Sequence, residues 1–159
     1  MTQQGLETLA TVIELAEKKR DEGLAALSAA RREHQAAQEQ MDQLTAYAAE
    51  AQQRWQARCA SGVDAAWLMH HRQFMAKVEH AMDFQTGVLG QKQRQIEQVQ
   101  QQVHEAEREL ATLRQYVARQ QEARQQRLMR REQKQTDEMA LNAHRRRAES
   151  DSTFQSFSA

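Results

Sequence analysis

Apolar residues recur along the first third of the chain with a spacing that alternates between three and four positions. This heptad can be followed from Leu6 to Arg58 without a slip, and it places both sets of positions on one stripe of a helix. The first set is Leu6, Ile13, Arg20, Leu27, His34, Met41, Ala48 and Trp55, and the second set is Leu9, Ala16, Gly23, Ala30, Ala37, Leu44, Ala51 and Arg58. Eight consecutive heptads favour a coiled coil over an ordinary amphipathic helix.

The heptad breaks at residues 59–64. Within this segment Gly62 suits the end of a helix or a turn, and Asp64 suits the N-cap of the next helix. A second seam follows. One set of its positions is apolar throughout, namely Met75, Met82, Leu89, Ile96, Val103, Leu110 and Val117, and the companion set is Val78, Gln85, Lys92, Val99, Ala106, Leu113 and Gln120.

The two seams predict how the chain folds back on itself. If the chain reverses at Gly62, residues whose numbers add up to about 123 lie opposite each other in an αα-hairpin, so Leu6 faces Val117. These are the first apolar residue of one seam and the last of the other, so the two seams end at the same level. We therefore expect an all-α fold, a long antiparallel two-helix coiled-coil hairpin over residues 1–149, with helix 5–59, turn 60–64 and helix 65–147.

Composition supports long helices and argues against a globular core. The chain has no proline and five glycines, and its aromatic content is 5%, so helix breakers are scarce and a narrow seam is expected. No apolar run is long enough to span a membrane, and no secretory signal opens the chain. Cys59 is the single cysteine, which suggests a reducing compartment. These features predict a cytoplasmic protein.

The charges balance overall but not along the chain. Residues 118–147 contain nine Lys or Arg against four Asp or Glu. This stretch is either a solvated charged helix or a surface that docks on an acidic protein. It has no aromatic residue for base stacking, which argues against sequence-specific nucleic-acid binding. Residues 150–159 are Ser-rich, and we expect them to be a disordered tail.

No pattern of catalytic or metal-binding residues emerges. No two of the six histidines are separated by the four positions that bring side chains together on a helix, so a metal site is not expected. Cys59 has no histidine nearby in sequence, and a two-helix hairpin offers no pocket for catalysis. The chain is expected to be non-enzymatic and to need no cofactor.

Large apolar residues follow the turn. Trp67 lies near it, and Phe74 and Ala81 each precede a seam position, so they are expected on the flank of the seam, where they stay partly exposed unless something covers them. Two interpretations are open. These residues plug the tip of the hairpin together with Trp55, or they form a patch on which a partner docks.

Several short motifs resemble the FliJ family of flagellar type III export proteins over nearly the whole chain. The residues that carry the resemblance are Leu15-Ala16-Glu17-Lys18-Lys19, Ser61-Gly62-Val63, Trp67, Gln73-Phe74, Val78-Glu79, Ala81-Met82, Gln133-Lys134 and Asp137-Glu138-Met139-Ala140. Trp67 with Gln73-Phe74, placed just after a glycine turn, is the most specific part.

The resemblance implies an antiparallel coiled coil similar to the γ stalk of rotary ATPases. Its implied partners are the hexameric export ATPase FliI, the cytoplasmic domain of the export gate FlhA, and export chaperones, at the cytoplasmic face of the inner membrane. It places the gate contact at Phe74, Val78, Ala81 and Gln85. It places the ATPase contact at Leu6, Leu9, Ile13, Lys18, Lys19, Leu113, Val117, Arg124, Arg127, Arg131 and Lys134.

Two other functions remain open. The chain could be the equivalent stalk of a virulence-type secretion system, which the flanking genes would distinguish. It could also be a basic coiled coil that binds nucleic acid or ribosomes, whose affinity would fall steeply with salt and would not depend on an ATPase.

Overall fold

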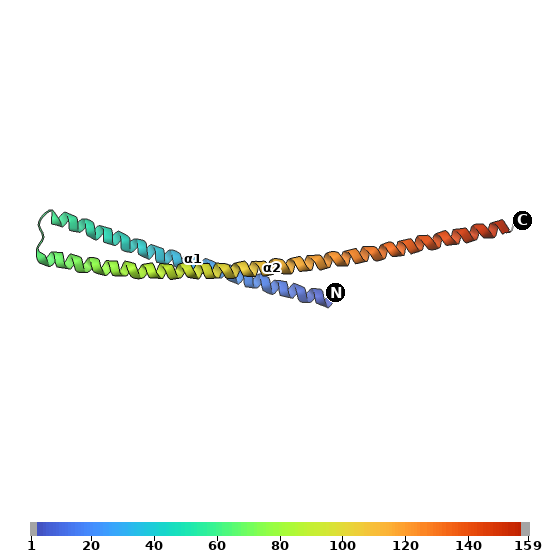
Figure 1. Ribbon diagram of the computed structural model, residues 1–159, viewed down its shortest axis with the longest axis horizontal. Helices are drawn as coiled ribbons and strands as arrows, with labels where there is room; N and C mark the ends of the chain where they lie inside the picture. The colour runs from blue at the N-terminus through green and yellow to red at the C-terminus, as the bar shows by residue number, and fades with distance from the viewer. Residues whose placement is uncertain (1–2, 157–159) are drawn as a thin grey trace. The chain divides into compact units, whose positions relative to one another are not determined.

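The computed structural model describes the backbone of residues 3–156 and the side chains of residue 5 and residues 7–150. Two helices account for nearly all of this part of the chain: α1 runs from Gln3 to Cys59 and α2 from Ala65 to Ser156 (Figure 1). The described residues form no strand. The prediction of an all-α helical hairpin is confirmed. None of the described helices combines the length and the apolarity needed to cross a membrane.

The chain divides into two compact units. One unit comprises residues 14–110, and the other comprises residues 1–13 together with residues 111–159. Each unit contains a segment of α1 and a segment of α2. That residues 1–149 form one continuous coiled coil stays a prediction.

In the unit of residues 14–110, α1 and α2 pack antiparallel. Tyr47 contacts Phe74, and Glu33 pairs with Lys92. The residue numbers in these pairs add up to 121 and 125, close to the expected sum of about 123. The predicted register is therefore confirmed in this unit, because a slip by one heptad along either helix would change the number by seven.

The predicted seams supply the interface between the helices of this unit. Its buried apolar residues are Ala16, Leu27, Ala30, Ala37, Val78, Val103, Ala106 and Leu110, and all of them occupy predicted seam positions. Four of the eight are alanines, so the two backbones lie close together. A Cβ atom added to Gly23 would lie 3.1 Å from Cγ2 of Val103. Burial of small side chains removes less apolar area from water, which limits the stability that the seam provides.

The turn shows why these residues reverse the chain. Gly62 has a φ of 93°, in the left-handed region that glycine adopts most readily. The hydroxyl group of Ser61 donates a hydrogen bond to the carbonyl oxygen of Arg58 at 3.0 Å, which satisfies one of the last carbonyl groups of α1. The Oδ1 atom of Asp64 accepts a hydrogen bond from the backbone N–H of Trp67 at 2.9 Å. Asp64 is therefore the N-cap of α2, as predicted.

Most of the described side chains in the unit of residues 1–13 and 111–159 are exposed. Leu9 and Ile13 of α1 and Leu113 and Val117 of α2 are half-buried, and every side chain from Arg124 to Ser150 is exposed. The side chain of Leu6 lies outside the described residues, so its position opposite Val117 stays a prediction.

The C-terminal part of α2 differs from the expectation. A helix end at Arg147 and a disordered tail at residues 150–159 were predicted, but α2 continues to Ser156. Residues 148–156 contain neither proline nor glycine, so no residue stops the helix once the preceding turns have formed. The remaining tail residues, 157–159, lie outside the described part of the chain.

Candidate functional site

The four residues expected at the export-gate contact are not equally accessible. Val78 is 6% exposed and Gln85 is 7% exposed, so both lie inside the interface between the helices of the hairpin. Phe74 and Ala81 are half-buried. Only Phe74 and Ala81 therefore present part of their side chains to a partner, and Val78 and Gln85 belong to the support beneath them.

Gln85 joins the two helices through its side-chain amide. Its Nε2 atom donates a hydrogen bond to the carbonyl oxygen of Ala37 at 2.8 Å and another to Oε1 of Gln40 at 3.2 Å. A buried amide without such partners would be strongly destabilising. These hydrogen bonds therefore explain how a polar residue is accommodated in an apolar seam, and they fix the position of α2 relative to α1 at this level.

Three residues of α1 lie beside the stretch of α2 from Phe74 to Gln85, and no sequence motif assigned them this role. The ring of Tyr47 meets the ring of Phe74 edge to face, with the centroids 5.5 Å apart. Gln40 and Leu44 line a shallow hollow together with Tyr47 and Gln85. The predicted register could have identified these three residues, because it places each of them opposite the stretch of α2 that contains Phe74 and Gln85.

A second surface lies on α2 in the other unit. Leu113 and Val117 occupy seam positions, and the next seam positions along the same helix are Gln120, Arg124, Arg127, Arg131 and Lys134. The spacing of three and four keeps these residues on one stripe of the helix. The stripe thus changes from apolar to cationic after Val117. We call Arg124, Arg127, Arg131 and Lys134 the basic stripe.

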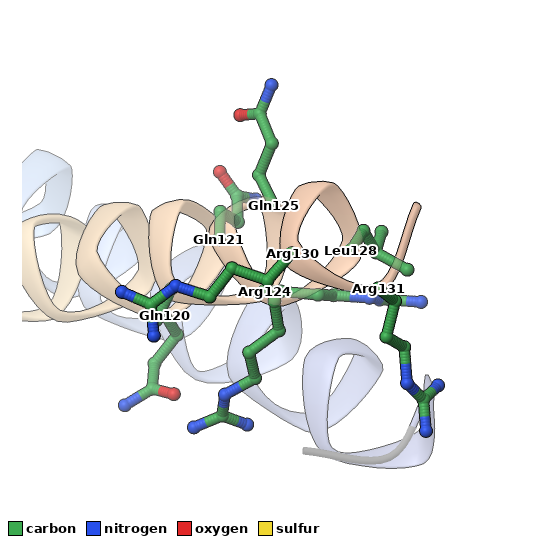
Figure 2. A pocket seen from close by; sticks show the side chains of 9 residues that line it. Gln120, Gln121, Arg124, Gln125, Leu128, Arg130 and Arg131 are labelled. Atoms are coloured by element: carbon green, nitrogen blue, oxygen red, sulfur yellow. The ribbon is translucent and has the colours of Figure 1, made fainter. Parts of the chain in front are cut away.

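The basic stripe is exposed, and Arg124, Arg127 and Arg131 have no acidic residue three or four positions away along the helix. Figure 2 shows Arg124 and Arg131 extending to the same side of α2, away from Gln125. Nine residues between positions 120 and 131 border an open groove along this helix, and Leu128 is the largest apolar side chain among them. Glu122 and Glu132 occupy heptad positions on the outer side of the helix, and Glu138 ends the stripe. The positive charge therefore faces one way and suits an anionic surface.

Two of the three lysines expected at the ATPase contact, Lys18 and Lys19, belong to the unit of residues 14–110. Both are exposed, and Nζ of Lys19 lies 3.2 Å from Oε2 of Glu109 on α2. An exposed ion pair of this kind adds little stability. Lys19 can therefore exchange Glu109 for another carboxylate at a small cost in free energy.

The described residues form surfaces suited to binding other proteins. Within the part of the chain that the structure describes, no three His, Cys, Asp or Glu side chains come together as ligands for a metal ion. His71 serves packing, because its ring stacks on Trp55 with the centroids 4.2 Å apart. What the described residues can do is bind partners through apolar and charged faces of the helices.

Comparison with known proteins gives one family. The family model described as "Flagellar FliJ protein" matches residues 5–149. No curated protein and no solved structure gives a significant match. The match covers both helices and the turn between them, and it includes the basic stripe.

Proposed function

The chain belongs to the FliJ family of flagellar export proteins, and from this premise we propose that it is a non-enzymatic stalk that binds the hexameric export ATPase and couples it to the export gate. ATP is hydrolysed by the partner, and the hairpin transmits the effect by contact. Export chaperones are further proposed partners. The protein acts in the cytoplasm, at the cytoplasmic face of the inner membrane, through these partners.

The observation that carries the ATPase contact is the change of the α2 stripe from apolar to cationic. Up to Val117 the stripe has the composition of a helix–helix interface, and from Arg124 onward it has four cations with no acidic residue between them on the stripe. If another helix packed against this part of the stripe, it would bury the four cations without partners, at a high cost in free energy. An acidic lining of a ring lumen would instead pair with them, and Leu128 beside the stripe supplies an apolar contact.

Reversal of the charges tests this contact. We expect the combined substitution Arg124→Glu, Arg127→Glu, Arg131→Glu and Lys134→Glu to weaken binding to the ATPase hexamer by at least about tenfold, because each introduced glutamate repels the carboxylates that the original cation attracted. Binding is measured by titration on a sizing column, with helicity checked by circular dichroism.

A matched variant controls for total charge. Arg119, Arg130, Arg146 and Arg147 lie on α2 outside the seam positions, and their combined reversal to Glu changes the net charge by the same amount. If this variant loses binding as severely as the first, the contact depends on net charge and the basic stripe is not the docking face.

The gate contact is proposed for the surface formed by Phe74 and Ala81 of α2 with Tyr47 of α1. Phe74→Ala removes a half-buried ring that contacts Tyr47. We expect it to abolish detectable binding to the cytoplasmic domain of the export gate while the helicity stays the same. A pull-down with the purified gate domain measures the effect. The control is Phe84→Ala, which removes a ring that is 71% exposed on the same helix. Equal loss in both variants would contradict the assignment.

The nucleic-acid alternative makes an opposite prediction for the basic stripe. A polyanion would bind it with an affinity that falls steeply as salt is raised, with or without the ATPase. Binding of a short RNA duplex at physiological salt, unaffected by competing ATPase, would favour that alternative. We favour the ATPase because the stripe has only four cations and no aromatic residue for stacking.

A further inference from the structure

The tip of the hairpin contains a hollow that extends past the proposed gate contact, with which it shares Tyr47 and Phe74. It lies between the last turns of α1 and the first turns of α2, has a volume of about 860 Å³, and is open to solvent. The two tryptophans of the chain both line it. Trp55 stacks on His71 with an angle of 9° between the rings, and the guanidinium carbon of Arg58 lies 3.9 Å from the ring centroid of Trp67.

The guanidinium group of Arg58, which lines the hollow, forms no ion pair with a described residue. The carboxylate of Glu50 pairs with Arg54, and the carboxylate of Asp64 accepts the backbone N–H of Trp67. Among the described residues, no carboxylate lies within ion-pair distance of Arg58. A guanidinium group held over an indole ring keeps donors free in the plane of the group. Arg58 is thus placed to receive an anion from outside the chain.

The apolar part of the hollow is incompletely covered. Trp67 is 43% exposed and Tyr47 is 52% exposed, so large aromatic surfaces remain in water. Covering them with an aliphatic or aromatic side chain would be favourable by about 25 cal/mol for each Å² removed from water. A cavity of this size is within the range of about 300–1,000 Å³ that accommodates a compact ligand or a few side chains.

We propose that this tip hollow binds an acidic peptide segment that carries a leucine or phenylalanine anchor. The apolar anchor covers the indole rings of Trp55 and Trp67, and a neighbouring carboxylate of the segment pairs with Arg58. Charge complementarity selects this occupant over a basic segment. A nucleic-acid strand fits less well, because the hollow offers a single uncompensated guanidinium and no track of cations along it. The peptide site shares Tyr47 and Phe74 with the proposed gate contact, whereas Trp55, Trp67 and Arg58 lie outside that contact.

Intrinsic fluorescence of the full-length protein tests the proposal directly. Because both tryptophans line the hollow, their emission reports on this site and is insensitive to peptides bound at the basic stripe. Three short peptides of equal length serve as probes. The first is built from aspartate, glutamate, leucine and phenylalanine, the second replaces its acidic residues with lysine, and the third replaces its apolar residues with serine. We expect a saturable change with the first peptide and at least about tenfold weaker responses with the others.

Variants locate the binding to the tip. Arg58 is exposed, so Arg58→Gln is expected to leave helicity unchanged and to weaken binding of the first peptide by about tenfold, the usual effect of losing a charge-assisted contact. Arg119→Gln removes an exposed arginine outside the hollow and should have no effect. The proposal is overturned by an equal response to the lysine peptide, by the absence of a saturable response, or by unchanged affinity of Arg58→Gln. A tryptophan spectrum that shifts with protein concentration alone would also overturn it, because a second copy of the chain would then fill the hollow.

Discussion

Gln85 shows how one residue can be misread when only its family position is known. The resemblance places it at the export-gate contact, yet its side chain is 7% exposed and is committed to Ala37 and Gln40 of α1. The heptad predicts that Gln85 faces the other helix. It does not predict the hydrogen bonds, because periodicity locates a side chain on a face without fixing its rotamer or its partners. Because Gln85 lines the same hollow as Tyr47, which contacts Phe74, we propose that it is a positioning residue for the docking surface.

Gln85→Ala is therefore expected to act first on stability. The substitution removes the hydrogen bond to the carbonyl oxygen of the buried Ala37 and opens a gap in the seam, so the free energy of unfolding should fall by about 1–3 kcal/mol. Urea unfolding followed by circular dichroism measures this. Gln91→Ala, at an exposed position of the same helix, is the control and should change stability little. Loss of gate binding by Gln85→Ala with no loss of stability would contradict the positioning role.

At the level of the elements, local chemistry explains the helix ends at the turn better than the end of α2. Gly62 and Asp64 were identified from sequence because a left-handed residue and an N-cap each require few residue types, and both occupy those roles. The Ser-rich composition of the tail suggested disorder, whereas α2 continues to Ser156. Composition alone does not end a helix, and residues 148–156 lack a proline or glycine to do so.

The cap of α2 gives a test at this scale. Asp64→Ala removes the acceptor of the Trp67 N–H and should lower the free energy of unfolding by about 0.5–2 kcal/mol. Asp64→Asn keeps a side-chain oxygen at the same place and should stay close to the wild type. Thermal unfolding of the two variants, followed at 222 nm, compares them. Equal destabilisation by alanine and asparagine would show that the charge of Asp64, and not its hydrogen bond, stabilises the start of the helix.

For the whole molecule, the heptad predicted the fold more completely than the sites. Heptad spacing and the scarcity of proline and glycine were enough to predict the seam positions, the turn and the position of Tyr47 opposite Phe74. The sites required the structure, because exposure depends on which helix covers each side chain. Val78 and Gln85 are covered, while the partners of Phe74 come from α1, far away in sequence. The spacing of the four cations of the basic stripe can be read from the sequence. Their interpretation as a docking surface requires knowing that the apolar residues before them on the same stripe face another helix.

Steady-state ATP hydrolysis by the export ATPase, measured with increasing amounts of this protein, tests the central claim most directly. A stalk placed inside a ring acts on several subunits at once, so stimulation should saturate well below one chain per ATPase subunit. A chain that ends at Val117 lacks the basic stripe and should not stimulate. Unchanged hydrolysis at every ratio, together with no complex on a sizing column, would contradict the stalk function.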